Sequence, residues 1–437
     1  MKNDKRIGLS LSGGGYRAAA FHLGTLIKLN ELGILKYIDV LSTISGGSIA
    51  GAYYLMKKDD FQTFEAGLKQ CLGKSVIRRI LFSPFMLGLY AALLALLLVV
   101  FYNTWRQYNI VAGLLAIFLL VIILLVFQFT FLPLTALKIR AYRRIFFGKK
   151  TLKDLPGTPL IAINATNLET GTLWTYSQNK VSDSSYAFPK DKGPAITFNA
   201  ADFPLAIAVA SSTCVPVPFT PVKIDKRYFS NPADYKRVSP SLSDGGLYDN
   251  QGIHKLTERK SSYRCDVIIC SDGSEPFRFS FAGNNSFQVL YRANDIMMRK
   301  IKSLQFIRDV YSRQFEIAYF SLDWHYEICI SGFIKAIEED KVTEEVLAYY
   351  ALTPALLSDI KTNQQTLQEE VKQKIGFATI TAAGLTVDEI KEISRIKTGL
   401  SAFTEQRIEL IARHAATLTE LQVKLYCPTL INDHHGI

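Results

Sequence analysis

Ser45 is the residue of this sequence whose surroundings best suit nucleophilic chemistry. It lies in Thr43–Gly47, where a predicted strand turns directly into a predicted helix. A strand-to-helix turn of this kind is a nucleophile elbow, which exposes the hydroxyl at the edge of a sheet. The positive end of the helix dipole favours a developing alkoxide, so a weakly acidic serine becomes easier to activate. Ser45 is therefore our candidate nucleophile for acyl transfer.

The elbow departs from the usual Gly-x-Ser-x-Gly pattern at one position. Thr43 stands where the first glycine belongs, which adds a side chain at a crowded turn. Two other serines compete, because Ser48 lies one turn into the helix and Ser10 lies inside a strand. Neither occupies the strand-to-helix junction, so Ser45 is preferred.

Asp244 is the better candidate for the base that this serine needs. It lies within 243–252, a dense turn whose glycines let an acid project from a tight loop. By itself an Asp-Gly-Gly run is most often only a turn. The six histidines lack supporting motifs, however, and no hydrolase order of Ser, Asp and His is evident.

Gly13, Gly14 and Gly15 end the first predicted strand and open the first predicted helix. Their amides can converge on an anion beside the end of the second strand, so we predict an oxyanion hole there. Arg17 follows at once, and we expect it to support the loop or to meet a substrate phosphate. A solvent-exposed charge in the first helical turn is the alternative.

The same glycines also fit a dinucleotide-binding pattern, Gly-x-Gly-x-x-Ala, from Gly13 to Ala18. Such a unit needs an acid at the end of the second strand to hold a ribose. Here that strand ends in Ser45, and its only acid, Asp39, starts it. An NAD(P)-binding membrane oxidoreductase stays open as an alternative, as does a non-catalytic membrane scaffold with the same fold.

A parallel α/β core is needed to bring these residues together. The sequence predicts a βαβα unit, with a strand over 7–12, a helix over 17–32, a strand over 39–44 and a helix to Met56. Ligands bind at the carboxyl ends of the strands in such units. Further elements are expected as strands over 159–164, 172–177 and 265–270, a helix over 204–211, and amphipathic helices over 289–313, 367–375, 387–396 and 404–425.

Two uncharged apolar stretches, 85–102 and 110–132, interrupt this core. Each is long enough to cross a hydrocarbon layer of about 30 Å, so we predict a transmembrane helical hairpin. The link over 103–109 contains Trp105 and Tyr108, as an interfacial turn would. Two core helices of a soluble protein, or a hairpin that dips into one leaflet, are the alternatives.

The net charge of +11 is concentrated around this hairpin. Residues 74–150 hold ten Lys and Arg and no acid, and the basic residues flank the apolar stretches. By the positive-inside rule both ends of the hairpin, and with them the catalytic domain, are expected in the cytoplasm. The first residues show no secretory signal pattern, so we expect the N-terminus there too. The six scattered cysteines are expected to be reduced, with no metal site.

Taken together, the motifs Gly13–Arg17, Ser45–Gly47 and Asp244–Gly246 resemble, in order and spacing, those of patatin-like phospholipases. The segment 210–219, with its small residues and prolines, also looks like the family's segment before the Asp-Gly motif. The resemblance covers roughly residues 7–275 apart from the hairpin. A residue other than glycine two positions before the serine is similar to the variant in cytosolic phospholipase A2 relatives.

The resemblance implies a Ser-Asp dyad without histidine that cleaves acyl esters of phospholipids, lysophospholipids or neutral lipids, with no cofactor. The expected fold is α/β, with a patatin-like open, mainly parallel sheet flanked by helices, an inserted two-helix transmembrane hairpin and a mainly helical C-terminal region. The expected division is 1–80 and 151–285 for the catalytic domain, 81–150 for the hairpin and 286–437 for the C-terminal region. The expected partners are a phospholipid or lysophospholipid substrate and the bilayer, not nucleic acid.

Overall fold

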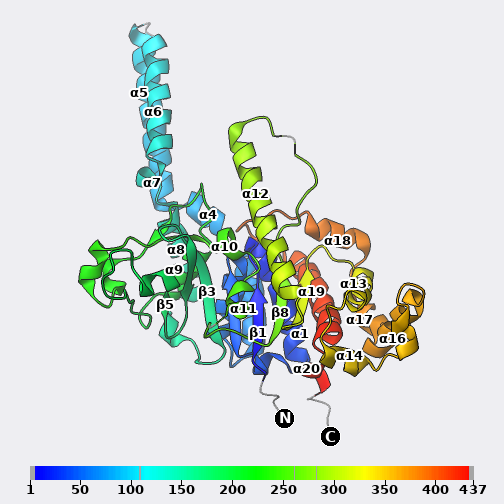
Figure 1. Ribbon diagram of the computed structural model, residues 1–437. Coiled ribbons are helices and arrows are strands. Elements are labelled where there is room, and N and C mark those ends of the chain that lie inside the picture. The colour runs from blue at the N-terminus through cyan, green and yellow to red at the C-terminus, as the bar shows by residue number, and fades with distance from the viewer. Residues whose placement is uncertain (1–4, 108–109, 260, 282, 433–437) are drawn as a thin grey trace.

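The described strands form one mixed sheet (Figure 1). The computed structural model describes residues 5–107, 110–259, 261–281 and 283–432. Within them the strand order is β5-β4-β3-β2-β1-β8-β9, and β7 pairs with both β3 and β6. The strands are β1 (Ile7–Leu11), β2 (Val40–Ile44), β3 (Leu160–Asn167), β4 (Thr172–Tyr176), β5 (Val181–Ser182), β6 (Val222–Lys223), β7 (Ser241–Asp244), β8 (Val267–Asp272) and β9 (Glu316–Ser321). From β3 to β9 the neighbours run parallel, which confirms the predicted mainly parallel α/β sheet.

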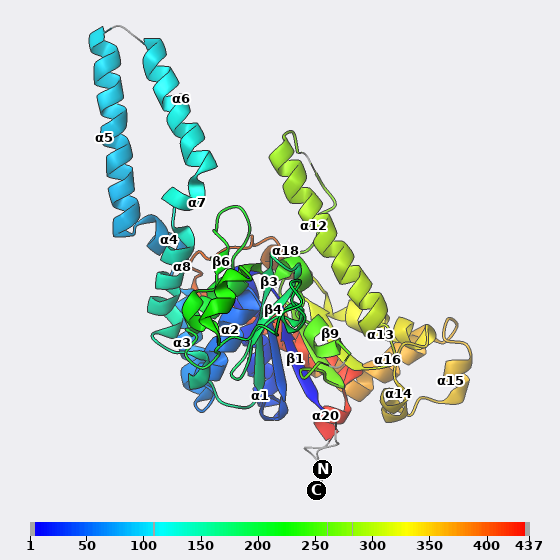
Figure 2. The same cartoon turned by 60° about the vertical axis from the view of Figure 1, so that its left-hand side comes forward.

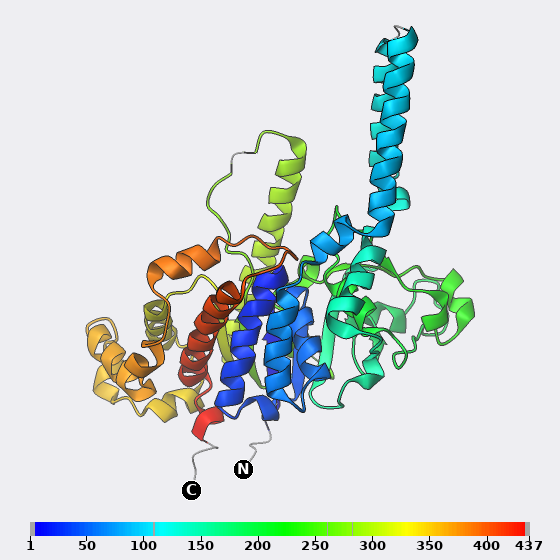
Figure 3. The same ribbon diagram turned by 180° about the vertical axis from the view of Figure 1, so that it is seen from behind.

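Helices cover both faces of the sheet, and the strand sequences show why. In β8, Ile269 joins the large core on one side, while Ile268 and Cys270 join a second apolar cluster on the other. Alternation of this kind buries both faces of a parallel strand. The first face is covered by α1 (Gly15–Glu31), α2 (Gly46–Met56) and α19 (Glu405–Tyr426) (Figure 3). On the second face lies the short α11 (His254–Thr257).

The C-terminal region is mainly helical, as predicted, but it also contributes a strand. The segment of β9, Glu-Ile-Ala-Tyr-Phe-Ser, is buried throughout and pairs with β8 at the edge of the sheet. The helices here are α12 (Ser286–Gln305), α13 (Tyr326–Glu338), α14 (Glu344–Tyr350), α15 (Pro354–Ser358), α16 (Gln364–Ile375), α17 (Phe377–Thr381), α18 (Val387–Ser394), α19 and α20 (Thr429–Asn432). Because α19 packs along α1 and β9, this region is built into the same core as the sheet.

A pair of apolar helices leaves the domain on the side of the carboxyl ends of the parallel strands (Figures 1 and 2). The elements of this insertion are α3 (Phe61–Leu72), α4 (Val76–Leu81), α5 (Pro84–Gln107), α6 (Ile110–Val126), α7 (Gln128–Phe131) and α8 (Leu134–Tyr142). Helices α5 and α6 lie side by side, and their apolar side chains are largely exposed. Tyr108 and Asn109, in the predicted interfacial turn, lie outside the described residues.

Two straight transmembrane spans are not confirmed. Among the described residues, Pro84–Arg106 is one stretch that is long and apolar enough to cross a membrane. A second exists only if Val111–Leu124 and Gln128–Phe147, which are bent by 79°, count as one span. The predicted helix over 110–132 breaks after Val126, where polar side chains follow and Pro133 cannot donate a helical hydrogen bond.

Candidate active site

Ser45 lies at the turn between β2 and α2, in a backbone conformation that side-chain-bearing residues rarely adopt. Its φ of 48° and ψ of −113° are those of a strained turn, and the residue is 6% exposed. Such strain persists only where the surroundings hold it in place. The Ser45 amide donates to Ser212 Oγ at 2.9 Å, and the Gly47 amide donates to the Ser12 carbonyl at 3.0 Å. The elbow is thus held from both sides.

The glycine after Ser45 is required by a close approach of two backbones. A Cβ on Gly46 would lie 2.2 Å from the carbonyl oxygen of Gly15, so no side chain fits there. Thr43, the departure from the elbow pattern, is accommodated differently. Its hydroxyl donates to the Ala162 carbonyl at 3.3 Å, and its methyl group lies over Gly51, which has no side chain.

Asp244 meets Ser45 because of the strand register. In β3, Asn164 pairs with Ile44, and the next residue, Ala165, pairs with Asp244 of β7. The end of β7 is therefore placed beside the end of β2. Ser45 Oγ donates to Asp244 Oδ2 at 2.9 Å, and the Gly246 amide donates to Oδ1 at 2.8 Å. Both carboxylate oxygens are occupied, which fixes the orientation of the carboxylate.

Burial makes Asp244 a stronger base than an exposed aspartate. The side chain is almost fully enclosed, and burial raises its pKa from 3.8 to about 6. The Gly246 amide, the Ser45 hydroxyl and the positive charge of Lys138 oppose this rise, because each favours the carboxylate. The result is a carboxylate that is ionised at neutral pH and has a pKa near the working range of a general base.

Lys138 of α8 is a residue whose role reasoning from the sequence missed. It is one of the ten basic residues counted around the hairpin, and the structure buries it completely. Its Nζ donates to the carbonyls of Ala210 and Thr213 at 3.1 and 2.9 Å and lies 4.0 Å from the ring centroid of Phe219. Burial lowers its pKa to about 8. In the sequence, Lys138 is a single charge next to apolar residues. The same pattern is found at the ends of membrane spans, so it does not predict burial.

The glycine loop lies against the elbow, and its amides differ in availability. The Gly13 amide already donates to the Asn250 carbonyl at 2.9 Å. The amides of Gly14 and Gly15 have no acceptor among the described residues of the protein. Gly15 opens α1 next to Gly46, so its amide lies at the positive end of the helix beside the nucleophile. Of the three glycines predicted to form an oxyanion hole, Gly14 and Gly15 are therefore the ones whose amides are available to a ligand.

Arg17 is fully buried rather than solvated. Its guanidinium donates to the carbonyls of Gly273 and Ile396 and to Thr398 Oγ1, and it lies 3.7 Å from the Glu275 carboxylate. These partners come from the end of β8 and from the segment before α19. Arg17 thus ties the helix after the glycine loop to the C-terminal region, which agrees with the predicted support of the loop.

Comparison with known proteins decides the family. The model of the patatin-like phospholipase family matches residues 9–257, more than half of the 437 residues. The chain belongs to the patatin-like phospholipase family. The match spans the glycine loop, Ser45 and Asp244, so the patatin-like motifs predicted from the sequence lie inside it.

Individual patatin-like relatives overlap this chain only in part. The "Putative meiotic phospholipase SPO1" of Saccharomyces cerevisiae (strain ATCC 204508 / S288c) is 38% identical over 48 residues, which are 11% of this chain and 8% of that protein. Human GIVD cytosolic phospholipase A2 in complex with methyl gamma-linolenyl fluorophosphonate matches 98% of this chain and 58% of its own, with 14% identity and a TM-score of 0.44. VipD from Legionella pneumophila matches 70% and 56%, with 17% identity and a TM-score of 0.31. The chain thus covers less than two thirds of each of these proteins.

Other candidates for chemistry have structural partners. Ser48 Oγ donates to Thr43 Oγ1 at 3.0 Å, and Ser10 Oγ donates to the Gln251 carbonyl. Nε2 of His22, which is fully buried, lies 2.9 Å from the Ser12 carbonyl oxygen, and burial lowers the pKa of this histidine to about 4. Among the described residues no histidine ring hydrogen-bonds to Ser45 or Asp244. Ser45 and Asp244 are therefore the candidate pair at this site.

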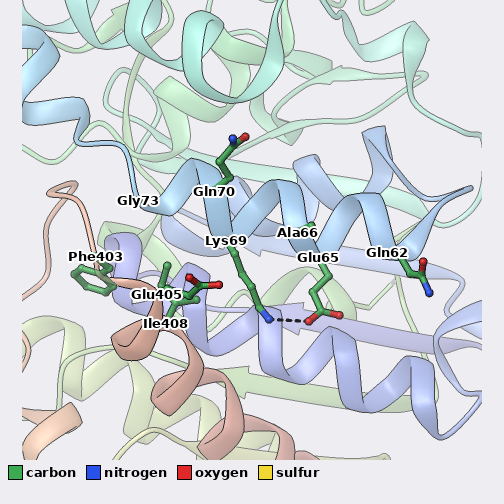
Figure 4. A pocket seen from close by; sticks show the side chains of 9 residues that line it. All are labelled: Gln62, Glu65, Ala66, Lys69, Gln70, Gly73, Phe403, Glu405 and Ile408. Carbon is green, nitrogen blue, oxygen red and sulfur yellow. Dashed lines mark hydrogen bonds and ion pairs between the residues drawn. The ribbon is translucent and has the colours of Figure 1, made fainter.

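One surface hollow of about 610 Å³ lies away from this site, between α3 and the start of α19 (Figure 4). Polar side chains such as Glu65, Lys69 and Glu405 line it, and Lys69 donates to Glu65 at 2.8 Å across one helical turn. None of its lining residues belongs to the three motifs. We therefore assign it no part in the chemistry.

Proposed function

We propose that this chain is a membrane-anchored lipid acyl hydrolase in which Ser45 is the nucleophile and Asp244 the general base. The observation that carries the proposal is the 2.9 Å hydrogen bond from Ser45 Oγ to Asp244 Oδ2 at a strained elbow. The amides of Gly14 and Gly15 lie beside it and have no acceptor in the part of the chain that the structure describes. Membership of the patatin-like phospholipase family supports an ester of a lipid as the substrate.

The first half of the reaction forms an acyl-enzyme. Ser45 Oγ attacks the ester carbonyl carbon while its proton passes to Asp244 Oδ2. The amides of Gly14 and Gly15 stabilise the negative charge on the carbonyl oxygen, which contributes most when donors are already aligned. Collapse of the tetrahedral intermediate breaks the ester bond, and Asp244 returns the proton to the departing alcohol oxygen.

The second half releases the acyl group. Water attacks the acyl carbon and gives a proton to Asp244, the same amides stabilise the oxyanion, and Ser45 takes the proton back as the fatty acid leaves. Because an aspartate is a weak base, the oxyanion donors and the α2 dipole must carry much of the rate enhancement. A raised pKa of Asp244 reduces this burden.

The main experiment compares hydrolysis of phospholipid and lysophospholipid vesicles by the wild type, Ser45→Ala and Asp244→Ala. We expect both variants to lose ester hydrolysis, and wild-type activity in either variant would refute the dyad. A fluorophosphonate probe should label the wild type and not Ser45→Ala, which also distinguishes an enzyme from a non-catalytic scaffold. A lipidomic comparison of cells with wild type and Ser45→Ala identifies the headgroup and the acyl position.

A dinucleotide site is disfavoured by the position of Asp39. Asp39 Oδ2 accepts a hydrogen bond from the Ile7 amide at 2.9 Å. This acid therefore lies at the amino ends of β1 and β2, whereas the glycine loop follows the carboxyl end of β1. A ribose held at that loop would need an acid at the other end of β2. Titration with NAD and NADP followed by tryptophan fluorescence is expected to show no saturable change.

Anchoring is proposed to come from α5 and α6, which project from the site side with apolar, exposed side chains. A hairpin there would hold the catalytic mouth at the cytoplasmic leaflet, so a lipid would move only a short way to Ser45. The intact chain should stay in the membrane fraction after an alkaline wash. Replacing 84–131 by a short flexible linker should release it, and retention of that variant would refute the anchor.

A further inference from the structure

The tip of α12 presents an apolar surface that the proposed chemistry does not use. Every residue from 286 to 291 is exposed, including Phe287, Val289, Leu290 and Tyr291. In the loop before the helix, Phe279 exposes 89% of its surface. Patches of this kind on a folded protein mark a contact with another apolar phase. Successive helical residues are about 100° apart, so Val289 lies on a different side of the tip from Phe287 and Tyr291. A groove on a folded partner would cover only part of these side chains, whereas a fluid interface can enclose them.

Positive charge accompanies these apolar residues. Within α12 there are four basic residues and one acid, Asp295. Arg292 and Arg299 lie over the ring of Phe277, with 3.9 and 4.4 Å from guanidinium carbon to ring centroid. Lys300 beside them is exposed. Aromatic and aliphatic side chains next to Arg and Lys are typical of helices that bind the surface of an anionic bilayer.

The base of α12 is attached to the candidate active site. It packs against α10 (Gly246–Asp249), which follows Asp244 directly. Lys302 also pairs at 2.9 Å with Asp272 at the end of β8, the neighbour of β1 and its glycine loop. In three views the tip of α12 rises on the same side of the domain as α5 and α6, and the chain ends lie on the opposite side (Figures 1, 2 and 3).

We propose that α12, together with Phe277 and Phe279, is a second membrane contact that inserts shallowly into an anionic bilayer surface. This inference rests on the membrane anchoring proposed above. A hairpin alone leaves the domain free to tilt and rotate about one attachment. A second contact on the other side of the site fixes the orientation of the Ser45 pocket toward the headgroups, and the basic residues select anionic lipid.

The contact can be measured by quenching in vesicles. The six native cysteines are buried, so a fluorophore can be attached to single cysteines introduced at exposed positions. We choose Leu290→Cys at the tip, Leu98→Cys on α5, and Glu369→Cys on α16 as the control remote from the hairpin (Figure 1). Each labelled full-length protein is reconstituted into phosphatidylcholine vesicles with about a third phosphatidylglycerol, with and without lipids that carry a doxyl quencher.

Quenching at 290 by shallow doxyl groups is expected to be at least threefold stronger than at 369. Equal quenching at 290 and 369, together with deep quenching at 98, would overturn the second contact and leave the hairpin intact. Absence of quenching at 98 would instead refute the proposed anchor. Hydrolysis of a short-chain monomeric ester by each labelled protein confirms that the domain is folded.

The functional test separates surface binding from chemistry. The double variant Phe287→Asp/Leu290→Asp should lower the ratio of vesicle hydrolysis to monomeric-ester hydrolysis by about tenfold, because carboxylates are unfavourable at a lipid surface. Leu290→Met, which keeps the apolar character, is the matched control and should keep the ratio. A variant that merely misfolds lowers both activities together. An unchanged ratio in the double variant would refute the proposal.

Discussion

Replacing Asp244 by asparagine should make the protein more stable while removing its activity. Asparagine keeps the shape of the side chain. Its amide oxygen can accept the Gly246 amide, and its NH2 group can donate to Ser45 Oγ, so both contacts of the carboxylate have a counterpart. The variant lacks the buried negative charge and cannot take the serine proton. Removal of a general base typically lowers a rate by about 10²–10⁴-fold.

The size of the stability gain follows from the pKa of Asp244. Burial raises this pKa from 3.8 to about 6. Each unit corresponds to about 1.4 kcal/mol, so the charged form lowers the free energy of unfolding by about 3 kcal/mol above pH 6. The folded state holds the proton more tightly than the unfolded state, so this penalty is absent below pH 3.8 and complete above pH 6. With about 2 cal/mol/K of unfolding entropy per residue, 3 kcal/mol corresponds to about 3 °C in Tm.

Thermal unfolding of wild type and Asp244→Asn, followed by tryptophan fluorescence at pH 7.5 and pH 5, tests this reasoning. The variant should unfold about 3 °C higher at pH 7.5, and this gain should shrink to about half at pH 5, because the wild-type carboxyl is then mostly protonated. Asp59→Asn, at an exposed position, serves as control and should show no such pH-dependent gain. A variant less stable than the wild type at pH 7.5, or a gain that does not depend on pH, would show that Asp244 carries no burial penalty.

Three further outcomes are expected from the same geometry. The kcat/KM for a monomeric ester should fall about tenfold per pH unit below about pH 6, because protonated Asp244 cannot act as a base; a profile flat from pH 7 to pH 4.5 would contradict this. Gly46→Ala should abolish hydrolysis and lower Tm, since its Cβ would meet a backbone oxygen at 2.2 Å, whereas Gly332→Ala in open space on α13 should keep hydrolysis and should not lower Tm, because alanine favours a helix. Lys138→Met should move the acid limb of the pH profile to higher pH, because its charge favours the Asp244 carboxylate; Arg140→Met, an exposed change on the same helix, should leave the limb in place.

The core of the candidate site could be predicted because its parts are local. Strand, glycine turn and helix follow one another within a few residues at the loop and at the elbow. Parallel strands also place their carboxyl ends at one edge, so Ser45 and Gly15 had to be neighbours once β1 and β2 paired. The position of Asp244 could not be predicted from neighbouring residues, because it depends on the pairing of β7 with the end of β3. For Asp244 the glycine-rich turn and the lack of a supported histidine gave a candidate, and the order of the motifs, compared with a family, made it specific.

Features that depend on distant contacts could not be read from the sequence. In the sequence, Lys138 looks like one of the basic residues that flank a membrane span. Only the fold shows that its Nζ is buried and donates to the carbonyls of Ala210 and Thr213. The strand β9 lies in a helix-rich stretch and shows no alternation, because it is buried throughout. The apolar composition of 110–132 concealed the break after Val126, since hydropathy averages over a window and does not register a local bend.

The least local part of the site is the support of the glycine loop. The carbonyl of Gly399 accepts the Tyr16 amide at 2.9 Å, and a Cβ on Gly15 would lie 2.4 Å from that same oxygen. Arg17 reaches the adjacent Ile396 and Thr398. The backbone of the glycine loop is thus packed between the elbow and the segment around Gly399, nearly 400 residues later in the chain. Oxyanion donors must be aligned before the reaction begins, so we expect the packing of α19 along α1, which holds the Gly399 segment in place, to matter for the proposed oxyanion hole as much as the loop itself.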